Sequence, residues 1–243
     1  QLDPANYKID WDVLEEKIGP KTKMIIINTP HNPSGNILQK EDMLKLETLL
    51  KDTNILLLSD EVYEHIIFDR EKHQSAMCFP GLAERAFVTA SFGKTFHNTG
   101  WKMCYCVAPP KMMAEFRKVH QFNVFSVNHP IQVALAQYLK NENNYMDLGA
   151  FYQRKRDLFL NEIADSRFRF KPSKGTYFQL LDYSAISDEH DVALSARLTK
   201  ELKVASIPVS VFNEPGVNTK VLRFCFAKKD ETLVKAAKIL KAI

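Results

Sequence analysis

Glycine and cysteine are scarce in this chain, and long apolar runs are missing from it. Among 243 residues there are 8 glycines and 4 cysteines. No cysteines form a C-x-x-C pair, and three of the four lie in apolar, strand-like contexts, so we expect reduced thiols in the core of a cytoplasmic protein. No stretch is long enough to span a membrane and no signal peptide is visible, so we expect no membrane partner.

A strong excess of charge of either sign is also missing. The net charge is +4, from 33 basic and 29 acidic residues. This balance is too mild to indicate nucleic-acid binding, and no basic cluster is long enough to form an electrostatic footprint. A composition of 45% hydrophobic and 26% charged residues instead indicates a soluble globular protein with a substantial core.

The first 110 residues contain short, continuously apolar segments separated by segments of helical periodicity. The apolar segments rich in β-branched residues predict buried strands at 24–27, 55–58, 86–90 and 102–108. Helical spacing predicts helices at 11–18 and 39–51. Alternation of strands and helices implies crossover connections, so the predicted fold class is α/β with a mostly parallel sheet.

After Pro110 the pattern changes to helices followed by mixed elements. Helices are predicted at 111–124, 130–140, 145–164, 192–202 and 231–242, and strands at 168–170, 176–181, 209–212 and 221–227. We therefore expect residues 151–243 to form a smaller α+β domain behind a large domain in residues 1–150, with the boundary near Ala150.

Polar residues whose side chains could take part in catalysis or binding follow three of the predicted strands. They are Asn32, the pair Asp60 and Tyr63, and Lys94. Ligands of open α/β sheets collect at the carboxyl ends of the strands, so these residues form a site hypothesis. A lysine at a buried strand end can act as an amine nucleophile. A phosphate-binding P-loop is excluded because Val88 stands where that motif needs glycine.

Each of these residues also has an ordinary structural explanation. Lys94 could be a surface lysine in a turn, Asp60 a helix N-cap, Tyr63 a half-buried tyrosine, and Asn32 a turn residue. Glu64 and His65 suggest a metal site, but no H-E-x-x-H motif and no second histidine at ligand spacing accompany them, so we predict no metal.

Arg223 lies inside the apolar segment 221–227. An unpaired charge is very costly in such a segment, so the guanidinium must have a partner or face a cleft. That partner is either a structural carboxylate or a substrate carboxylate held by two hydrogen bonds.

Together these side chains supply what pyridoxal phosphate chemistry needs. That chemistry requires a lysine to form a Schiff base, an acid at the pyridine nitrogen, and donors to the ring oxygen. The motifs N-T-P-H-N-P-S-G, S-D-E-V-Y, S-F-G-K-T-F-H-N-T-G-W-K and V-L-R-F-C-F-A occur in this order. Over its whole length the chain resembles the fold-type I pyridoxal phosphate aminotransferases of class I/II, and most closely their methionine and kynurenine aminotransferase-like branch.

The resemblance implies an aspartate aminotransferase-like fold and a role for each residue. Lys94 resembles the lysine that binds the cofactor covalently, Asp60 the partner of the pyridine nitrogen, and Tyr63 and Asn32 the partners of the ring oxygen. Ser91 and Lys102 resemble the phosphate ligands, although many members have arginine in place of Lys102. Arg223, with Asn32, resembles the site that binds the substrate carboxylate. A cis peptide at Asn32–Pro33 is implied as well.

The implied activity is transfer of an amino group from an L-amino acid, methionine or aromatic preferred, to a 2-oxo acid by a homodimer. Phe96 and Phe125 are candidates for an apolar substrate pocket. Two alternatives stay open: a cysteine-S-conjugate β-lyase, and the aminotransferase-like effector domain of a transcription regulator.

Family members carry three further features ahead of the matching region: a glycine-containing phosphate turn, an aromatic residue stacked on the cofactor and a dimer-contact arm. We therefore expect this chain to be the C-terminal part of a longer one, with a C-terminal part of the large domain in residues 1–150. We expect weak cofactor retention by this part alone.

Overall fold

A computed structural model describes residues 2–3 and 5–243 of the chain. Its larger sheet contains β1 (Met24–Asn28), β2 (Leu56–Asp60), β3 (Ala86–Ser91) and β4 (Cys104–Val107), in that order. β1, β2 and β3 are parallel, and β4 is antiparallel to β3. The four strands predicted in this half are confirmed, and so is the α/β class with a mostly parallel sheet.

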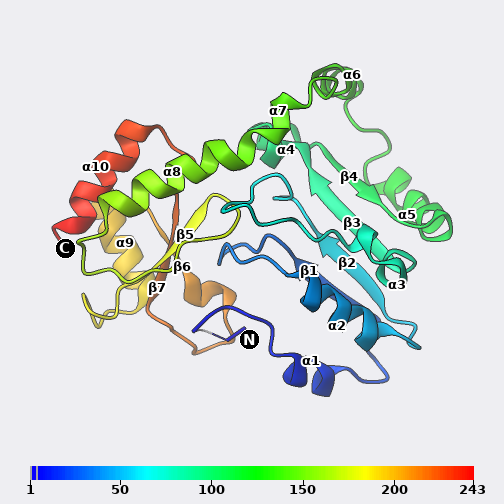
Figure 1. The fold of residues 1–243 in the computed structure, drawn as a ribbon, viewed down its shortest axis with the longest axis horizontal. Coiled ribbons are helices and arrows are strands. Elements are labelled where there is room, and N and C mark those ends of the chain that lie inside the picture. The colour runs from blue at the N-terminus through cyan, green and yellow to red at the C-terminus, as the bar shows by residue number, and fades with distance from the viewer. Residues whose placement is uncertain (1, 4) are drawn as a thin grey trace.

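Helical segments precede, separate and follow the strands of this sheet along the chain (Figure 1). They are α1 (Trp11–Lys17), α2 (Lys40–Leu50), η1 (Ala76–Cys78), α3 (Pro80–Ala83), α4 (Phe92–Thr95), η2 (Thr99–Trp101), α5 (Pro110–Asn123), α6 (His129–Tyr138) and α7 (Asn143–Met146). α2 begins with a capping box between Gln39 and Asp42, and its buried Met43 and Leu46 pack with Leu57 of β2 in one core cluster.

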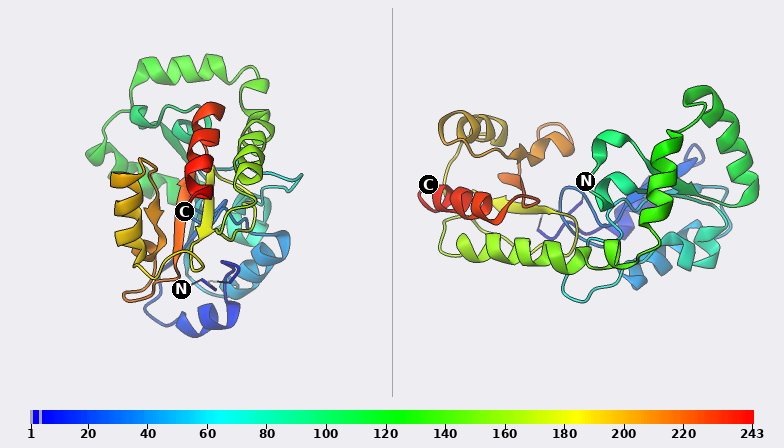
Figure 2. Two further views of the ribbon diagram at one scale, coloured as in Figure 1. Left: turned by 90° about the vertical axis from the view of Figure 1, so that its left-hand side faces the viewer. Right: turned by 90° about the horizontal axis from the view of Figure 1, so that it is seen from above.

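The second half forms an antiparallel sheet in the order β5-β7-β6. Its elements are α8 (Leu148–Glu162), β5 (Phe178–Asp182), α9 (Asp191–Glu201), β6 (Ile207–Pro208), η3 (Val209–Phe212), β7 (Val221–Cys225) and α10 (Asp230–Lys241). The long helix α8 extends from α7 into the second half, where it packs beside α10 (Figures 1 and 2). Tyr63, Ile66 and Phe68, which follow β2, are buried in the same cluster as the second sheet, so the two halves share a core.

Three predictions in the second half are wrong. Residues 209–212 form η3 instead of a strand, because the buried carboxylate of Asp191 accepts from the N–H and the hydroxyl of Ser210, at 2.8 and 2.7 Å. Residues 168–170 make only an isolated bridge between Arg169 and Asp182. The predicted helix 145–164 is interrupted at Asp147, which separates α7 from α8.

The expectation of core thiols is wrong for Cys78, Cys104 and Cys106, whereas Cys225 packs against the core cluster of the second half. Cys78 and Cys104 are exposed, and Cys106 and Cys225 are partly exposed, although all four are free. Cys104 and Cys106 lie on β4, an edge strand with mostly exposed side chains. An edge strand is paired on one side only, so an apolar sequence there does not guarantee burial.

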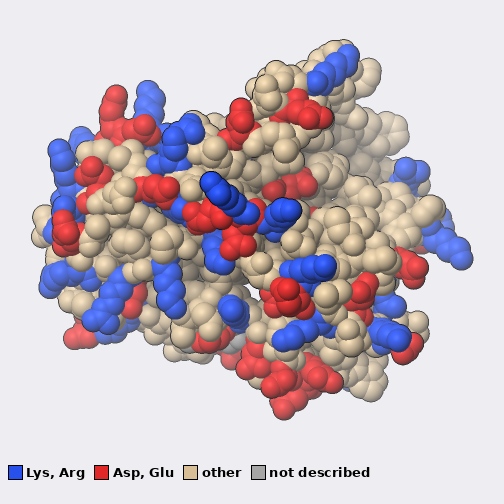
Figure 3. Space-filling view, viewed as in Figure 1, with Lys and Arg blue, Asp and Glu red and all other residues tan. Residues whose placement is uncertain are grey.

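On the face shown in Figure 3, acidic and basic side chains are interspersed. No helix within residues 2–3 and 5–243 is long and apolar enough to cross a membrane. The predicted domain boundary at Ala150 falls near the start of α8 and stays a prediction.

Candidate active site

The carboxyl ends of β1, β2 and β3 lie side by side, which brings the predicted site residues together. The register pairs Asn28 with Asp60 and Asp60 with Thr89. The Asn28 side chain then connects two parts of the site. Its amide nitrogen donates to the carbonyl of Asp60 at 3.0 Å, and its Oδ1 accepts from the N–H of Asn32 at 2.8 Å. Asn28 was missed from the sequence, although a polar residue that ends an apolar strand was the signal for it.

Asp60 is the last residue of β2, and its side chain is partly buried. Its carboxylate accepts a hydrogen bond from the backbone N–H of Val62 at 3.2 Å, and no other described group donates to it. Burial is the largest influence on Asp60 and raises its pKa, and the nearby charge of Glu61 raises the pKa further. The Val62 N–H and the charge of Lys94 lower it, but the net shift is upward. The carboxylate therefore has unused acceptor capacity in a partly desolvated position.

Lys94 lies in α4, directly after β3. Its Nζ is 5.9 Å from the centre of the Tyr63 ring, and it donates no hydrogen bond to any residue that the structure describes. The close approach of Thr99 to α4 favours Gly93, because a Cβ there would lie 3.0 Å from the Cα of Thr99. The structure thus places a lysine without a hydrogen-bond partner beside Tyr63 and within the electrostatic reach of Asp60.

Tyr63 is buried, with 2% of its surface exposed. Its ring makes an edge-on contact with Tyr177, with centroids 5.3 Å apart. Burial raises the pKa of the Tyr63 hydroxyl, and a hydrogen bond with Tyr177 raises it further, whereas the charge of Arg223 opposes the rise. Tyr177 was missed from the sequence, because only the tertiary structure brings it to Tyr63.

Arg223 lies in the middle of β7, and its partner within the fold is not the structural carboxylate that the sequence offered as one alternative. Its Nη1 donates to Oδ1 of Asn32 at 2.5 Å, and its guanidinium lies 4.0 Å from the centre of the Phe178 ring. No carboxylate among the described residues pairs with it. A guanidinium has five N–H donors, so most of its donor capacity is unused. The contact also orients the Asn32 side chain. Its oxygen faces Arg223, so its amide nitrogen points away from the guanidinium.

Ser91 and Lys102 lie at the same end of the β3–β4 pair. The register pairs Ser91 with Cys104, and the Ser91 hydroxyl lies 3.5 Å from the carbonyl of Met103. That hydroxyl also caps α4 by accepting from the Gly93 N–H at 3.1 Å. Lys102 is exposed at the end of η2, in a left-handed conformation with φ of 55°.

A second polar group lies directly behind Asp60, and sequence reasoning missed it. The carboxylate of Glu61 is 1% exposed and accepts from the Ser59 hydroxyl at 2.8 Å and the Ala76 N–H at 2.9 Å. It also contacts Nε2 of His73 at 2.7 Å. Burial alone would raise the pKa of Glu61, but the hydrogen bonds and the His73 charge lower it below its ordinary value.

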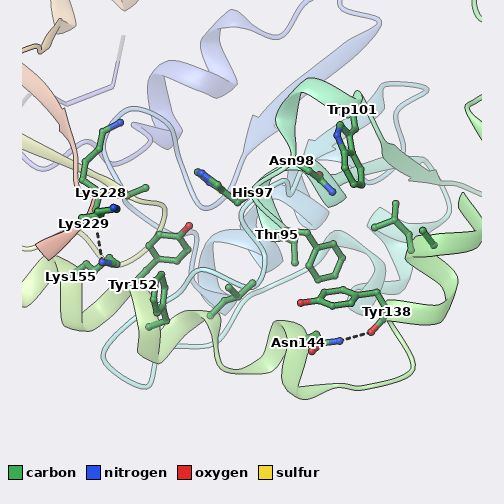
Figure 4. A pocket seen from close by; sticks show the side chains of 16 residues that line it. Thr95, His97, Asn98, Trp101, Tyr138, Asn144, Tyr152, Lys155, Lys228 and Lys229 are labelled. Atoms are coloured by element: carbon green, nitrogen blue, oxygen red, sulfur yellow. Dashed lines mark hydrogen bonds between the residues drawn. The ribbon is translucent and has the colours of Figure 1, made fainter. Parts of the chain in front are cut away.

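A cavity of about 900 Å³ opens beside α4 (Figure 4). Aromatic side chains supply much of its wall: Phe96, Trp101, Tyr138, Phe151 and Tyr152. Lys155 lies at its other end and is held by the Lys228 carbonyl and the Asp230 carboxylate, both at 2.8 Å. Asp60, Tyr63 and Lys94 do not line this cavity, which therefore adjoins the site and does not contain it.

Phe96 and Phe125, the two candidates for an apolar pocket, lie in different surroundings. Phe96 lines the cavity, whereas Phe125 is 85% exposed. The peptide Asn32–Pro33 is cis, as the resemblance implied, and Thr29–Pro30 is cis too. Among the residues placed by the structure, no group of three or more histidine, cysteine, aspartate or glutamate side chains could hold a metal ion.

Three features define the class of this protein: the mostly parallel sheet, the lysine directly after β3 and the acid that ends β2. The class is that of the aspartate aminotransferase-like, fold-type I pyridoxal phosphate-dependent transferases. Comparison with solved structures agrees. The chain superposes on the methionine aminotransferase of Escherichia coli with a TM-score of 0.96 at 46% identity, covering 100% of this chain and 64% of that one. On a double mutant of Thermus thermophilus aspartate aminotransferase the TM-score is 0.88 at 26% identity, covering 99% and 62%.

Sequence comparison gives the family. The sequence model of the aminotransferases of class I and II matches residues 2–240, so the chain belongs to this family. It is 46% identical over 243 residues to Escherichia coli methionine aminotransferase, covering 100% of this chain and 63% of that protein. It is 34% identical over 255 residues to a kynurenine–oxoglutarate transaminase of Dictyostelium discoideum, covering 95% and 59%. The chain thus spans about three fifths of the length of these curated relatives.

Members of this family use pyridoxal phosphate, and the residues present fit that cofactor. The ring nitrogen needs an acid, and the Asp60 carboxylate accepts only one hydrogen bond from the described residues. The aldehyde needs an amine, and Lys94 donates no hydrogen bond to them. The ring oxygen needs donors. The side-chain oxygen of Asn32 accepts from Arg223, and its amide nitrogen donates to no other described residue.

Proposed function

We propose that the protein is a pyridoxal phosphate-dependent aminotransferase that moves an amino group from an L-amino acid to a 2-oxo acid. One observation carries the proposal. The carboxylate of Asp60 is partly buried with a single hydrogen bond and a raised pKa, and Lys94, which has no hydrogen-bond partner among the described residues, lies within its electrostatic reach. Both the single hydrogen bond of Asp60 and the unpartnered amine of Lys94 are explained if the two residues bind a positively charged cofactor ring.

Six residues would hold the cofactor in this proposal. Lys94 would bond to it, and Asp60 would keep the ring nitrogen protonated. Tyr63 and Asn32 would donate to the ring oxygen, and Ser91 and Lys102 would bind the phosphate. Lys102 supplies charge without the two-pronged geometry of arginine. The bound cofactor supplies an electron sink for the charge that develops at the substrate Cα.

Lys94, Asp60 and Tyr63 would be the catalytic residues. When substrate is bound, the free amine of Lys94 is the base that takes the proton from Cα and later returns it. Asp60 keeps its negative charge at the ring nitrogen, where partial burial strengthens the interaction. The Tyr63 hydroxyl stays protonated near neutral pH because its pKa is raised, so it is a hydrogen-bond donor.

Arg223 and Asn32 would bind the substrate carboxylate. The guanidinium is held by one hydrogen bond and by stacking on Phe178, which leaves N–H groups for two bonds to a carboxylate. Relatives named for methionine and kynurenine, together with the aromatic cavity that Phe96 lines, support a preference for methionine or aromatic amino acids.

We also propose that the protein works as a homodimer in the cytoplasm. Val119, Phe122 and Phe125, on and after α5, are 62%, 86% and 85% exposed, and a second copy would cover them. The four free cysteines fit a reducing compartment. Light scattering at micromolar concentration tests the dimer, and a monomer mass would contradict it.

An assay of the full-length protein, reconstituted with pyridoxal phosphate, tests the function. L-methionine, L-phenylalanine and L-kynurenine are each offered with 2-oxoglutarate, and the oxo acid and glutamate formed are quantified together. We expect equal amounts of both products and parallel lines in double-reciprocal plots, because the oxo acid formed from the amino acid leaves before 2-oxoglutarate binds. A cysteine S-conjugate is offered in a parallel assay, and pyruvate formed from it without glutamate would indicate a β-lyase instead. Cofactor binding with no turnover of any substrate would contradict both enzymes.

A further inference from the structure

The helix α8 carries one fully buried arginine that the proposed chemistry does not use. Arg156 is 4% exposed, and its Nη atoms donate to both carboxylate oxygens of Asp69 at 2.7 and 2.8 Å. Nη1 also donates to the carbonyl of Ser173 at 2.6 Å, and Nε donates to Asp157 at 2.9 Å. The guanidinium lies 4.9 Å from the centre of the Phe68 ring. Arg156 therefore joins α8, the loop after β2 and the segment before β5.

The segment 171–176, which contains Ser173, is hydrogen-bonded on both sides. On one side the N–H groups of Lys174 and Gly175 donate to the carbonyl of Gly35, at 3.0 and 2.9 Å. On the other side Phe68 N–H donates to the Lys174 carbonyl, and Thr176 N–H donates to the Ile66 carbonyl, both at 2.9 Å. This segment therefore holds the two loops that follow β1 and β2 together.

Close approach of the segment to the first loop depends on Gly35. Its φ is +72°, and a Cβ there would lie 2.4 Å from the Cβ of Ser173. The loop held in this way, 29–35, is the one that carries Asn32. Ser173, which Arg156 contacts, is therefore followed directly by the residues that hydrogen-bond to Gly35 in the Asn32 loop.

The same segment leads directly into the residues that surround Arg223. Phe178, two residues beyond Thr176, stacks under the guanidinium at 4.0 Å, and Asn32 accepts from it at 2.5 Å. Both contacts of Arg223 therefore come from parts of the chain that segment 171–176 positions. A displacement of this segment would move the two contacts together.

We propose that Arg156 is a positioning residue for the substrate carboxylate site, acting through Ser173 and Asp69 on the segment 171–176. This inference depends on the proposed function of Arg223 and Asn32. Its consequence is specific: loosening the segment weakens carboxylate binding, because Asn32 and Phe178 no longer hold Arg223 in one orientation. Lys94 and Asp60 are held by the larger sheet and stay in place, so the turnover number changes little.

The test compares two variants with a matched control in the full-length protein, with cofactor for kinetics and without it for hydrogen exchange. Arg156→Lys keeps the charge but loses the paired hydrogen bonds to Asp69, and Asp69→Asn removes the charge from the other partner. The control is Lys174→Met, which breaks the ion pair between Lys174 and Glu71, 2.6 Å long and on the same segment but solvent-exposed. KM and kcat for L-methionine are measured, and hydrogen exchange of the 171–178 peptide is followed without cofactor.

We expect KM to rise about tenfold in both variants, with kcat within about threefold of wild type, and faster exchange of the 171–178 peptide. The control should match wild type in all three measurements. If the wild type is active, two results would overturn this inference alone. One is a lower kcat without a higher KM in the variants, and the other is hydrogen exchange in the variants equal to that of the control. An inactive wild-type holoprotein would overturn the proposed function and this inference with it.

Discussion

Two adjacent carboxylates at the end of β2 have opposite surroundings. Glu61 is almost fully buried, yet the Ser59 hydroxyl, the Ala76 N–H and the His73 ring all contact it, and its pKa is lowered. Asp60 is less buried, but among the described residues it accepts only the Val62 N–H, and its pKa is raised. The burial of a carboxylate therefore does not determine the direction of its pKa shift. The number of hydrogen-bond donors around the carboxylate determines it.

The difference separates a structural acid from a functional one. A carboxylate with three donors is compensated within the fold and contributes to stability. A carboxylate with unused acceptor capacity costs stability unless a ligand supplies the missing partner, and such groups concentrate at functional sites. On this basis Glu61 anchors the loop after β2, whereas we propose that Asp60 pairs with the ring nitrogen of a cofactor.

The largest effect is expected from Asp60→Asn. The amide cannot hold the ring nitrogen protonated, so kcat/KM should fall by about 10³-fold, as for loss of a preorganised electrostatic group. Unfolding free energy should stay the same or rise slightly, because a poorly compensated charge is removed. Steady-state kinetics and urea unfolding measure the two quantities. Loss of stability with full activity would reverse the roles of Asp60 and Glu61.

Glu61→Gln should show the opposite pattern, with a loss of about 2–3 kcal/mol in unfolding free energy at pH 7 and activity within a few-fold of wild type. Because the pKa of Glu61 is lower in the folded state, its contribution is present above the unfolded-state pKa and disappears as the pH falls through the folded-state pKa. Urea unfolding of both proteins should therefore converge in acid. A difference that persists or grows toward low pH would show that the carboxylate charge is not responsible.

Arg223 resembles Asp60 in having unused hydrogen-bonding capacity, and Arg223→Lys tests that similarity. Lysine keeps the charge but loses the planar pair of donors and the stacking on Phe178, so KM for L-methionine should rise about tenfold. The matched control is Arg197→Lys, at an exposed arginine paired with Glu189 in the second half of the chain. Equal KM values in the two variants would remove Arg223 from the substrate site.

The smallest effect is expected at His31, which lies beside Asn32. Burial lowers the pKa of His31 to about 4, and the ring contacts the Ser34 hydroxyl at 2.7 Å. The unfolded chain then binds more protons between pH 6.5 and 4, so stability falls as the pH is lowered through this range. His31→Gln should reduce the loss between pH 7 and 5.5 by about 1 kcal/mol. Identical slopes in urea unfolding would contradict a neutral, buried His31.

Much of the larger sheet could be predicted, because its strands are short apolar segments that end in polar residues. The same pattern led to Asn32, Asp60 and Lys94, which the structure brings to one edge. Local signals failed where distant partners decide the conformation. Residues 209–212 look like a strand but turn at Ser210, whose partner Asp191 is 19 residues away.

Contacts across the two halves had no signal in composition or periodicity, although the family resemblance placed Arg223 and Asn32 in one site. Arg156 meets Asp69 across 87 positions, and Arg223 meets Asn32 across 191. Tyr177, just before β5, and Phe178, at its start, are ordinary aromatic residues until the fold brings them to Tyr63 and Arg223. Hydrophobic periodicity indicates that such residues are inside, but not which residues they contact.

Covalent labelling tests the central claim most directly. The full-length protein is reconstituted with pyridoxal phosphate, reduced with borohydride and digested, and the pyridoxyl label is located by mass spectrometry. We predict one label on the peptide that contains Lys94, with Lys94→Ala unlabelled and Lys102→Ala labelled less because its phosphate contact is gone. A label on any lysine other than Lys94, or no label in a protein that binds the cofactor, would contradict the account.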